Sequence, residues 1–226
     1  MADPATLRVR GNMTVGSSDF TGGNGTVEFS GSSTITSGSA IFHNISVSGT
    51  ASIANTFYFD GTLTVNGTFG GSGSTTLYPR NGAAISVGGS MAMGQINIEP
   101  GMVVTASGNF SASSTFTIDG TFTPTATTVI SGSGTGTLGG TGTMKVTKTG
   151  GNSTTDALLG QYSSFATINH ANNTVEYAGT ANQFIKPRTF KNLIINNPVS
   201  VQIANGDIHI TNVMTFTQGL VMGVGN

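Results

Sequence analysis

Cysteine and tryptophan are absent from the sequence, and charge is scarce, with 8 Lys or Arg and 9 Asp or Glu among 226 residues. Without cysteine the chain can form neither a disulfide framework nor a thiolate metal site, which agrees with bacterial exported proteins that avoid thiols. A formal net charge of -1 provides no basic surface for nucleic acid or for an anionic membrane. We therefore expect no nucleic-acid partner.

Long apolar runs are missing as well. No run approaches the roughly 20 residues that span a bilayer, so we expect no membrane insertion. The residues at 1–4 lack the basic and apolar regions of an export signal, and the alternating pattern at 219–226 has no charged or capping closure. Either the protein is cytoplasmic, or the first residues replace a removed signal or an upstream portion of a longer chain, and we favour the second interpretation.

Short alternating segments, separated by linkers rich in Gly, Ser, Thr and Asn, fill most of the sequence. Gly accounts for 34 residues, and 36% of all residues are apolar. Alternation with a period of two, rich in Val, Ile, Thr and Phe, is typical of strands with one buried face. The segments are 26–29, 44–47, 62–65, 84–87, 102–105, 115–118 and 144–147. Helical spacing is almost absent; only 154–162 could form one or two helical turns.

One apolar residue per segment recurs at intervals of 20, 18, 22 and 17 residues. These markers are Val27, Val47, Val65, Val87 and Val104. A period near 20 indicates stacked units, and most linkers lack two-residue hairpin turns. We therefore predict an all-β fold, a parallel β-helix of about nine to eleven coils of about 20 residues each, with Gly and Asn at corners that need unusual backbone angles. An antiparallel β-sandwich or hairpin stack is the alternative.

The sequence also contains a repeat that is longer than this period of about 20 residues. The segment 24–31 matches 172–179, and at the same offset of 148 residues 42–47 matches 190–195. After a slip of three residues, the match continues toward residue 216. We predict a first module at 1–148, a junction at 149–171, and a second, truncated module at 172–226 that continues the same solenoid.

One block of residues resembles modules that are repeated in very large surface proteins of Bacteroidetes-type bacteria. The residues that carry the resemblance are 161–162, Phe165, 173–179 and 190–195. It covers about two thirds of the chain. The resemblance implies a right-handed parallel β-helix in an exported stalk or adhesin at the bacterial cell surface.

Metal and cofactor sites are not expected. His43, His170 and His209 have no His partner at close spacing. The segments 22–27 and 139–144 resemble a calcium-binding Gly-rich nonapeptide, but Val27 and Met144 occupy the position of the required carboxylate. The segment 134–139 fits a dinucleotide pattern, yet no helix is predicted after it to present an N-terminus to phosphate.

Parallel β-helices can also be polysaccharide-cleaving enzymes, which need two carboxylates that face one substrate. With coils of about 20 residues, Glu99 would stack on Asp119, and Asp156 on Glu176, as possible acid and base pairs. Such spacings arise by chance among nine acids, and Glu176 repeats Glu28, which favours a structural hydrogen bond for both. We therefore expect no enzyme activity and assign no catalytic, cofactor-binding or metal-binding residue.

Surface binding is the remaining class of function. The cluster Lys186, Arg188 and Lys191 could contact acidic glycans, and Thr-x-Thr spacings raise an ice-binding alternative. The 13 Phe residues lie in apolar register, which favours stacked core ladders over an exposed carbohydrate platform. The expected function is that of an extracellular structural protein, a stalk, adhesin or filament segment; a polysaccharide-active enzyme or an ice- or glycan-binding solenoid is the alternative. Open strand edges at its ends would favour end-to-end self-association or continuation into a longer chain.

Overall fold

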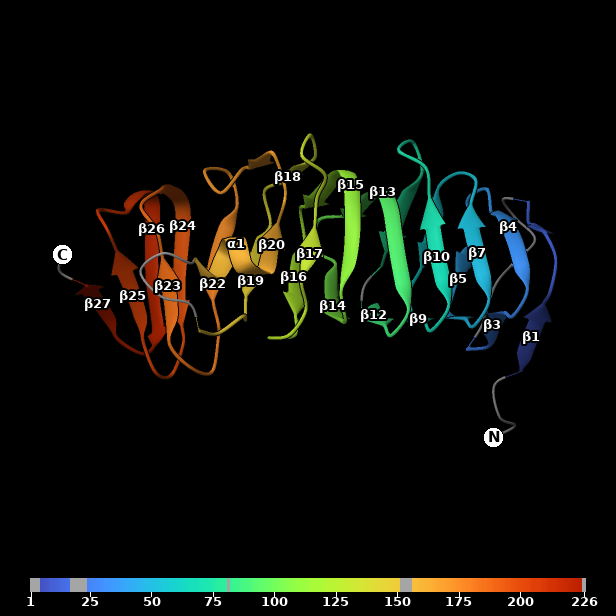
Figure 1. Cartoon of the computed structure of the whole chain (residues 1–226), viewed down its shortest axis with the longest axis horizontal. Helices are drawn as coiled ribbons and strands as arrows, with labels where there is room; N and C mark the ends of the chain where they lie inside the picture. The colour runs from blue at the N-terminus through green and yellow to red at the C-terminus, as the bar shows by residue number, and fades with distance from the viewer. Residues whose placement is uncertain (1–4, 17–23, 81, 151–155, 225–226) are drawn as a thin grey trace.

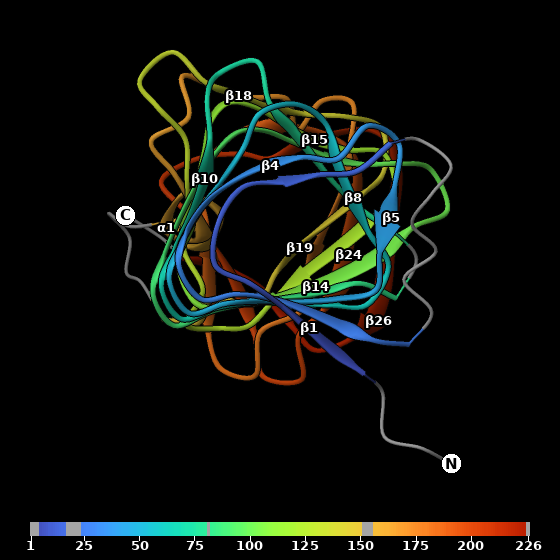
Figure 2. The same ribbon diagram turned by 90° about the vertical axis from the view of Figure 1, so that its right-hand side faces the viewer.

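The computed structural model is a parallel β-solenoid of about ten coils, stacked along one long axis (Figure 1). It describes residues 5–16, 24–80, 82–150 and 156–224. Seen from its N-terminal end, the chain runs clockwise as it recedes, so the coil is right-handed (Figure 2). Every strand pair in these residues is parallel. The parallel β-helix is confirmed, and the antiparallel alternative is wrong.

Three flat faces enclose the core, because most coils contribute one strand to each face. Face 1 is a single eleven-stranded sheet. Its strands are β1 (Thr6–Val9), β3 (Thr26–Phe29), β6 (Asn44–Val47), β9 (Thr62–Val65), β12 (Ala84–Val87), β14 (Val103–Ser107), β16 (Thr121–Pro124), β19 (Thr143–Val146), β22 (Thr174–Tyr177), β24 (Thr189–Asn196) and β26 (His209–Gln218).

Faces 2 and 3 belong to one thirteen-stranded sheet, because two long strands bend from one face to the other. Face 2 contains β2 (Met13–Thr14), β4 (Ser32–Thr36), β7 (Thr50–Ile53), β10 (Thr68–Gly71), the first halves of β13 (Ser90–Ile98) and β15 (Phe110–Ile118), β17 (Ile130–Ser131) and β20 (Tyr162–Ser163). Face 3 contains β5 (Ile41–Phe42), β8 (Phe57–Phe59), β11 (Thr76–Pro79), the second halves of β13 and β15, β18 (Thr137–Gly139) and β21 (Thr167–Ile168). A separate three-stranded sheet consists of β23 (Gln183–Ile185), β25 (Val201–Ala204) and β27 (Val221–Val224).

The core fills the inside of the coils, since alternate strand residues point inward. In β6 and β9, for example, the second and fourth residues are buried and the others are half-buried. Aromatic rings also pack within this core: Phe42 and Phe57 stack with centroids 4.8 Å apart, and Phe116 and Phe122 meet edge to face with centroids 5.1 Å apart. The expected stacking of core Phe rings is confirmed for Phe42 and Phe57.

Register differs from the predicted markers at both ends of the series. Val47 pairs with Val65, and Val65 with Val87, as expected. Val27, however, pairs with Ile45, and Val47 is the partner of Phe29. Val104 pairs with Phe122, and the next residue, Thr105, lies opposite Ala84, so Val104 and Val87 are both buried but are not register partners. Because the coils differ in length, the inward residue that pairs with a given marker is not always the marker of the next segment. A single marker per segment does not detect this difference.

Corners use Gly for close approach and Asn for hydrogen bonding. Gly140 has a φ of +115°, and a Cβ there would lie 2.2 Å from the carbonyl oxygen of Ile118 in the preceding coil. Among the described Asn residues, only Asn205 has a positive φ. Asn44 acts differently: its Oδ1 accepts the backbone N–H of Thr62, in the next coil, at 3.0 Å. The prediction of Asn at corners holds, but the reason given for it was mostly wrong.

The predicted junction at 149–171 is itself part of the solenoid. Face 1 passes through it, because β19 pairs with β22, although the paired residues Met144 and Val175 lie 31 positions apart. The extra residues include the helix α1 (Ala157–Gln161), within the segment expected to show helical character. Faces 2 and 3 are interrupted here: β20 and β21 are the last strands of the thirteen-stranded sheet, and β23 begins the three-stranded one.

Candidate functional site

The first pair of carboxylates predicted as a possible acid and base lies in neighbouring coils, but each member has a structural partner. Ile98 pairs with Ile118, so Glu99 and Asp119 directly follow paired residues. Asp119 Oδ1 accepts the N–H of Thr141 at 2.8 Å and its hydroxyl at 3.0 Å. Glu99 lies 3.8 Å from a guanidinium nitrogen of Arg80. Asp119 thus stabilises a corner, and Glu99 belongs to a surface ion pair.

The second pair is not brought together as an acid and base. Glu176 contacts Lys145 at 3.1 Å and accepts a hydrogen bond from Asn196 at 2.7 Å. Asp156 instead forms an ion pair with Arg188. Each carboxylate is therefore held by a different cation from another coil, and the predicted stacking of residues 20 apart is wrong here because the junction adds residues to this coil.

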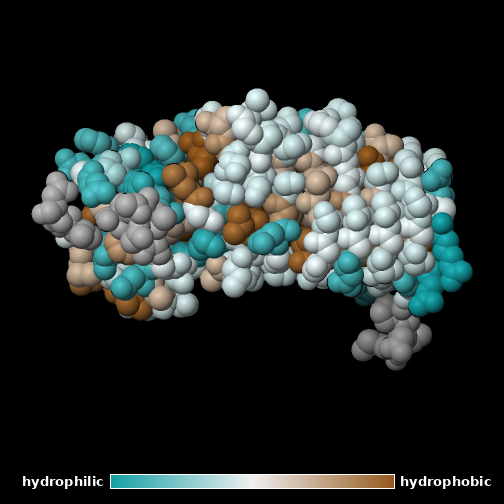
Figure 3. All heavy atoms as spheres, viewed as in Figure 1, coloured by the Kyte–Doolittle hydropathy of each residue, from teal (hydrophilic) through white to brown (hydrophobic). Residues whose placement is uncertain are grey.

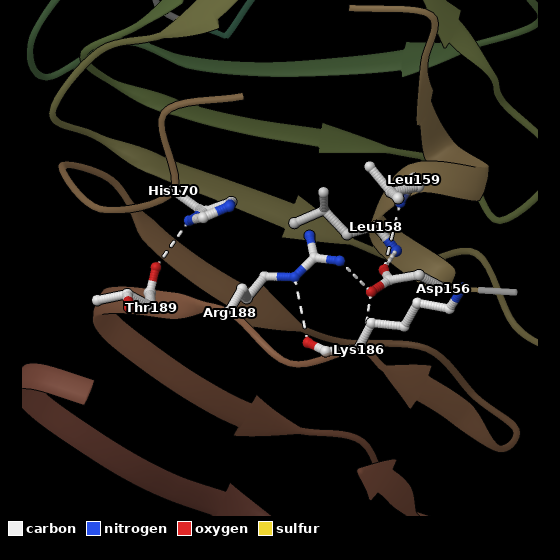
Figure 4. A network of polar contacts seen from close by, with 7 residues as sticks. All are labelled: Asp156, Leu158, Leu159, His170, Lys186, Arg188 and Thr189. Carbon is white, nitrogen blue, oxygen red and sulfur yellow. Dashed lines mark hydrogen bonds and ion pairs between the residues drawn. The ribbon is translucent and has the colours of Figure 1, made fainter. Parts of the chain in front are cut away.

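Asp156 is the centre of a buried polar network (Figure 4). One carboxylate oxygen caps α1 by accepting the N–H groups of Leu158 at 2.7 Å and Leu159 at 3.3 Å. The other accepts the N–H of Lys186 at 2.8 Å and the ion pair with Arg188. The side chain of Asp156 is fully buried and that of Arg188 is 9% exposed. Arg188 therefore serves the fold, and the predicted basic cluster does not present three free cations.

A hollow of about 290 Å³ opens beside this network, where faces 2 and 3 are interrupted. Its lining comes from α1, from the loop and strand around β21, and from the chain before β24. The lining residues are Leu159, Phe165, Ala166, Ile168, His170, Pro187 and Arg188. Five of these seven residues have apolar side chains, and His170 and Arg188 provide the polar side chains.

His170 bridges the break in face 3 with its side chain. Its Nδ1 lies 2.7 Å from the carbonyl oxygen of Thr189, so Nδ1 carries the proton and donates it. Burial lowers the pKa of His170 below its usual value, and the positive charge of Arg188 acts in the same direction; the bond to Thr189 and the charge of Asp156 oppose them. The neutral ring therefore keeps an unprotonated Nε2 as an acceptor.

Two buried Gln side chains bridge the break in face 2. Oε1 of Gln161 accepts the N–H groups of Thr147 at 2.7 Å and Lys148 at 2.8 Å. Nε2 of Gln183 donates to the carbonyl oxygens of Val146 and Lys148, both at 2.9 Å. Both Gln residues are fully buried. They satisfy backbone groups that strand pairing would otherwise satisfy, which explains how this face tolerates the insertion.

The remaining predicted candidates lie apart. His43 contacts Asp60 at 2.8 Å, and His209 is exposed in β26. Among the described residues, no three His, Asp or Glu side chains are close enough to share a metal ion. The segment 134–139 leads into β18 and then β19, so no helix follows it. Gly22 and Gly23 of the other Gly-rich segment lie outside the described residues.

The outer surface is mostly small and uncharged. Over face 2 in the middle of the solenoid, the outward residues of β4, β7, β10 and β13 are Ser, Thr, Gly or Ala, and this face is pale in Figure 3. On face 1, Thr121, Thr143 and Thr174 form a ladder between Val103 and Asn192. The predicted Thr arrays thus exist but are short.

Sequence analysis missed one outward aromatic pair. Tyr58 and Tyr78 are opposite each other in β8 and β11, with ring centroids 4.9 Å apart. The guanidinium of Arg80 lies 4.9 Å from the centre of the Tyr58 ring. The sequence shows this pair only through the 20-residue spacing of two Tyr residues outside the apolar register.

Comparison of the chain with protein-family models, with curated proteins and with solved structures finds no match. The resemblance to bacterial surface modules therefore stays a prediction. No helix in the described ranges has the length and hydrophobicity required to cross a bilayer.

Proposed function

We propose that this chain is a non-enzymatic structural segment of an extracellular bacterial surface protein, a solenoid stalk or adhesin. The observation that carries the proposal is face 1, an unbroken parallel sheet that continues from β1 to β26 through the insertion at the junction. Each added coil lengthens such a rod by ~4.8 Å, and coil energies add nearly linearly. The fold therefore suits a role in which reach and surface matter.

The surface chemistry supports the same role. Ser, Thr, Gly and Ala dominate the outward positions of face 2. The carboxylates considered as acids and bases are held by Arg80, Thr141, Lys145 and Arg188. A polysaccharide-cleaving enzyme needs two carboxylates that face one substrate, and these partners hold the four carboxylates in separate structural contacts.

The open ends of the sheets support association with further coils. β1 and β26 are the edge strands of face 1, and β27 is an edge of the three-stranded sheet. Side chains that would point into the core of another coil are exposed there: Leu7 is 49% exposed and Phe216 is 58% exposed. An edge of this kind templates further strand pairing. We infer end-to-end contact between copies, or with further coils of a longer chain.

Cleavage assays test the proposal most directly. We expect the chain to leave a panel of uronic-acid and neutral polysaccharides intact while remaining folded by circular dichroism. Reproducible cleavage that is abolished by Glu99→Gln or Asp119→Asn would overturn the structural role.

Light scattering over a concentration series tests the association. We expect the mean mass to rise with concentration, and Phe216→Asp to suppress the rise. Val103→Asp is the matched control, because Val103 is a 48% exposed apolar residue in the middle of face 1. Equal suppression by both variants, or a mass that does not change with concentration, would contradict stacking through the ends.

A further inference from the structure

The hollow beside α1 combines apolar walls with two polar atoms that have no partner among the described residues. Arg188 uses Nη2 for Asp156 and Nε for the carbonyl oxygen of Lys186, which leaves Nη1. His170 uses Nδ1 for Thr189, which leaves Nε2. In Figure 4, both free nitrogens lie on the side of the network toward Leu158 and Leu159. The Arg188 side chain is 9% exposed, and Arg188 and His170 both line the hollow.

These two atoms differ in what they can bind. Nη1 of a guanidinium is only a donor, and the unprotonated Nε2 of a neutral imidazole is an acceptor. A hydroxyl group is both donor and acceptor, so hydroxyl groups suit both nitrogens. A purely aliphatic group, such as a Leu side chain of a peptide, would leave both of them buried and unpaired, which is costly.

The charge of the hollow favours a neutral ligand. The positive charge of Arg188 is already balanced by Asp156, whose carboxylate is fully buried. Neither Lys186 nor Lys191 lines the hollow. A carboxylate ligand would meet the field of Asp156 without a free cation to offset it. The acidic glycans considered from the sequence are therefore the less suitable class.

The shape and walls fit one ring with an apolar face. Leu159, Phe165, Ile168 and Pro187 supply carbon atoms against which the C–H face of a sugar can pack. The volume of about 290 Å³ is just below the ~300–1,000 Å³ range of small-molecule sites, which suits a ligand group no larger than one ring. We propose that the hollow binds one ring of a neutral saccharide, with its hydroxyls on Arg188 and His170. This deepens the adhesive part of the proposed function and rests on it.

Ligand-detected NMR of the full chain tests the proposal with methyl glycosides of glucose, galactose, mannose and N-acetylglucosamine. Glucuronate and galacturonate are the charged comparison, and benzyl alcohol is an apolar probe. We expect at least one neutral glycoside to bind with at least tenfold higher affinity than either uronate. Binding of benzyl alcohol alone, preference for a uronate, or no binding at all would overturn the proposal.

Two matched variants locate the binding. The Ala166 side chain is exposed and lines the hollow, so Ala166→Phe fills the hollow without removing a core contact. Ser74→Phe places the same ring on an exposed loop between β10 and β11. We expect at least a tenfold loss of affinity for Ala166→Phe and no change for Ser74→Phe, with equal melting temperatures. Unchanged binding in Ala166→Phe would overturn the site. Cleavage of a saccharide would instead contradict the proposed function, so the two failures are distinguishable.

Discussion

Glu28 and Glu176 occupy the same position of the 148-residue repeat and make the same two kinds of contact. Each pairs with a cation opposite it in the preceding coil, Arg8 or Lys145. Each also accepts from a residue 20 positions later: the Ser48 hydroxyl lies 3.5 Å from Glu28, and the Asn196 amide lies 2.7 Å from Glu176. The repeat thus preserves a cation, a carboxylate and a donor in three successive coils.

The two copies of this contact differ in how deeply their side chains are buried. The side chains of Glu28 and Arg8 are 22% and 68% exposed, whereas those of Glu176 and Lys145 are 8% and 26% exposed. Arg8 lies in β1, an edge strand, while Lys145 lies inside the stack. The strength of the same motif therefore depends on its place in the solenoid, because water screens an exposed pair far more than a buried one.

The junction has an ion pair with no counterpart in the first copy, and its loss should have the largest effect. At the offset of 148, Arg188 corresponds to Ala40. Arg188→Met would leave the buried Asp156 without its cation, and we expect a loss of ~3–5 kcal/mol in the free energy of unfolding. Urea unfolding followed by circular dichroism measures it.

A double variant serves as the control for that experiment. Asn still caps a helix but carries no charge, so Asp156→Asn with Arg188→Met should recover much of the stability lost in Arg188→Met alone. A single variant as stable as the wild type would show that the pair contributes nothing.

Replacing the cation in each copy sharpens the comparison directly. We expect Lys145→Met to cost ~1–2 kcal/mol, because Glu176 is left buried with its Asn196 contact. Arg8→Met should cost less than ~1 kcal/mol, as for other exposed pairs. Urea unfolding midpoints of the two variants are compared under one set of conditions. Equal losses would mean that burial does not decide the strength of this motif.

The next core position of the repeat offers a reciprocal exchange. Phe29 and Tyr177 correspond and are both fully buried, but the Tyr177 hydroxyl is buried without a hydrogen-bond partner among the described residues. Tyr177→Phe should therefore raise the free energy of unfolding by ~1 kcal/mol, and Phe29→Tyr should lower it by a similar amount. Thermal unfolding provides the measurement. Destabilisation by Tyr177→Phe would reveal a partner for the hydroxyl.

The smallest expected effect is a pH dependence that belongs to the junction alone. Burial in the folded state lowers the pKa of His170 below its usual value of 6.5, and the charged groups that act on the ring are Arg188 and Asp156. The unfolded state then binds more protons, so stability is complete above that value and falls as the pH drops through the folded pKa. We expect the unfolding midpoint to depend less steeply on pH in His170→Gln than in the wild type, between neutral and mildly acidic pH. An unchanged slope would assign it to other groups.

The fold was predictable because its cause is local and repeated. Alternation in segments such as 62–65 sets which side chains point inward, and the coil period places like residues above one another. The repeat also predicted a structural hydrogen bond for Glu28 and Glu176, and both residues make one. The exact register was not predictable from Val27 or Val104. Coils differ in length by several residues, and each difference changes which residues of neighbouring strands are paired.

The candidate site could not be derived in the same way. Asp156 and Arg188 lie 32 positions apart in the sequence, and Gln161 and Lys148 lie 13 positions apart; neither separation is a multiple of the coil period. These contacts exist because the junction inserts residues that interrupt two faces, and buried backbone groups at the break must find other partners. Alternation and period, which the sequence contains, therefore determined the solenoid. The hollow, its charge and its free nitrogens were decided only where the tertiary structure departs from that period.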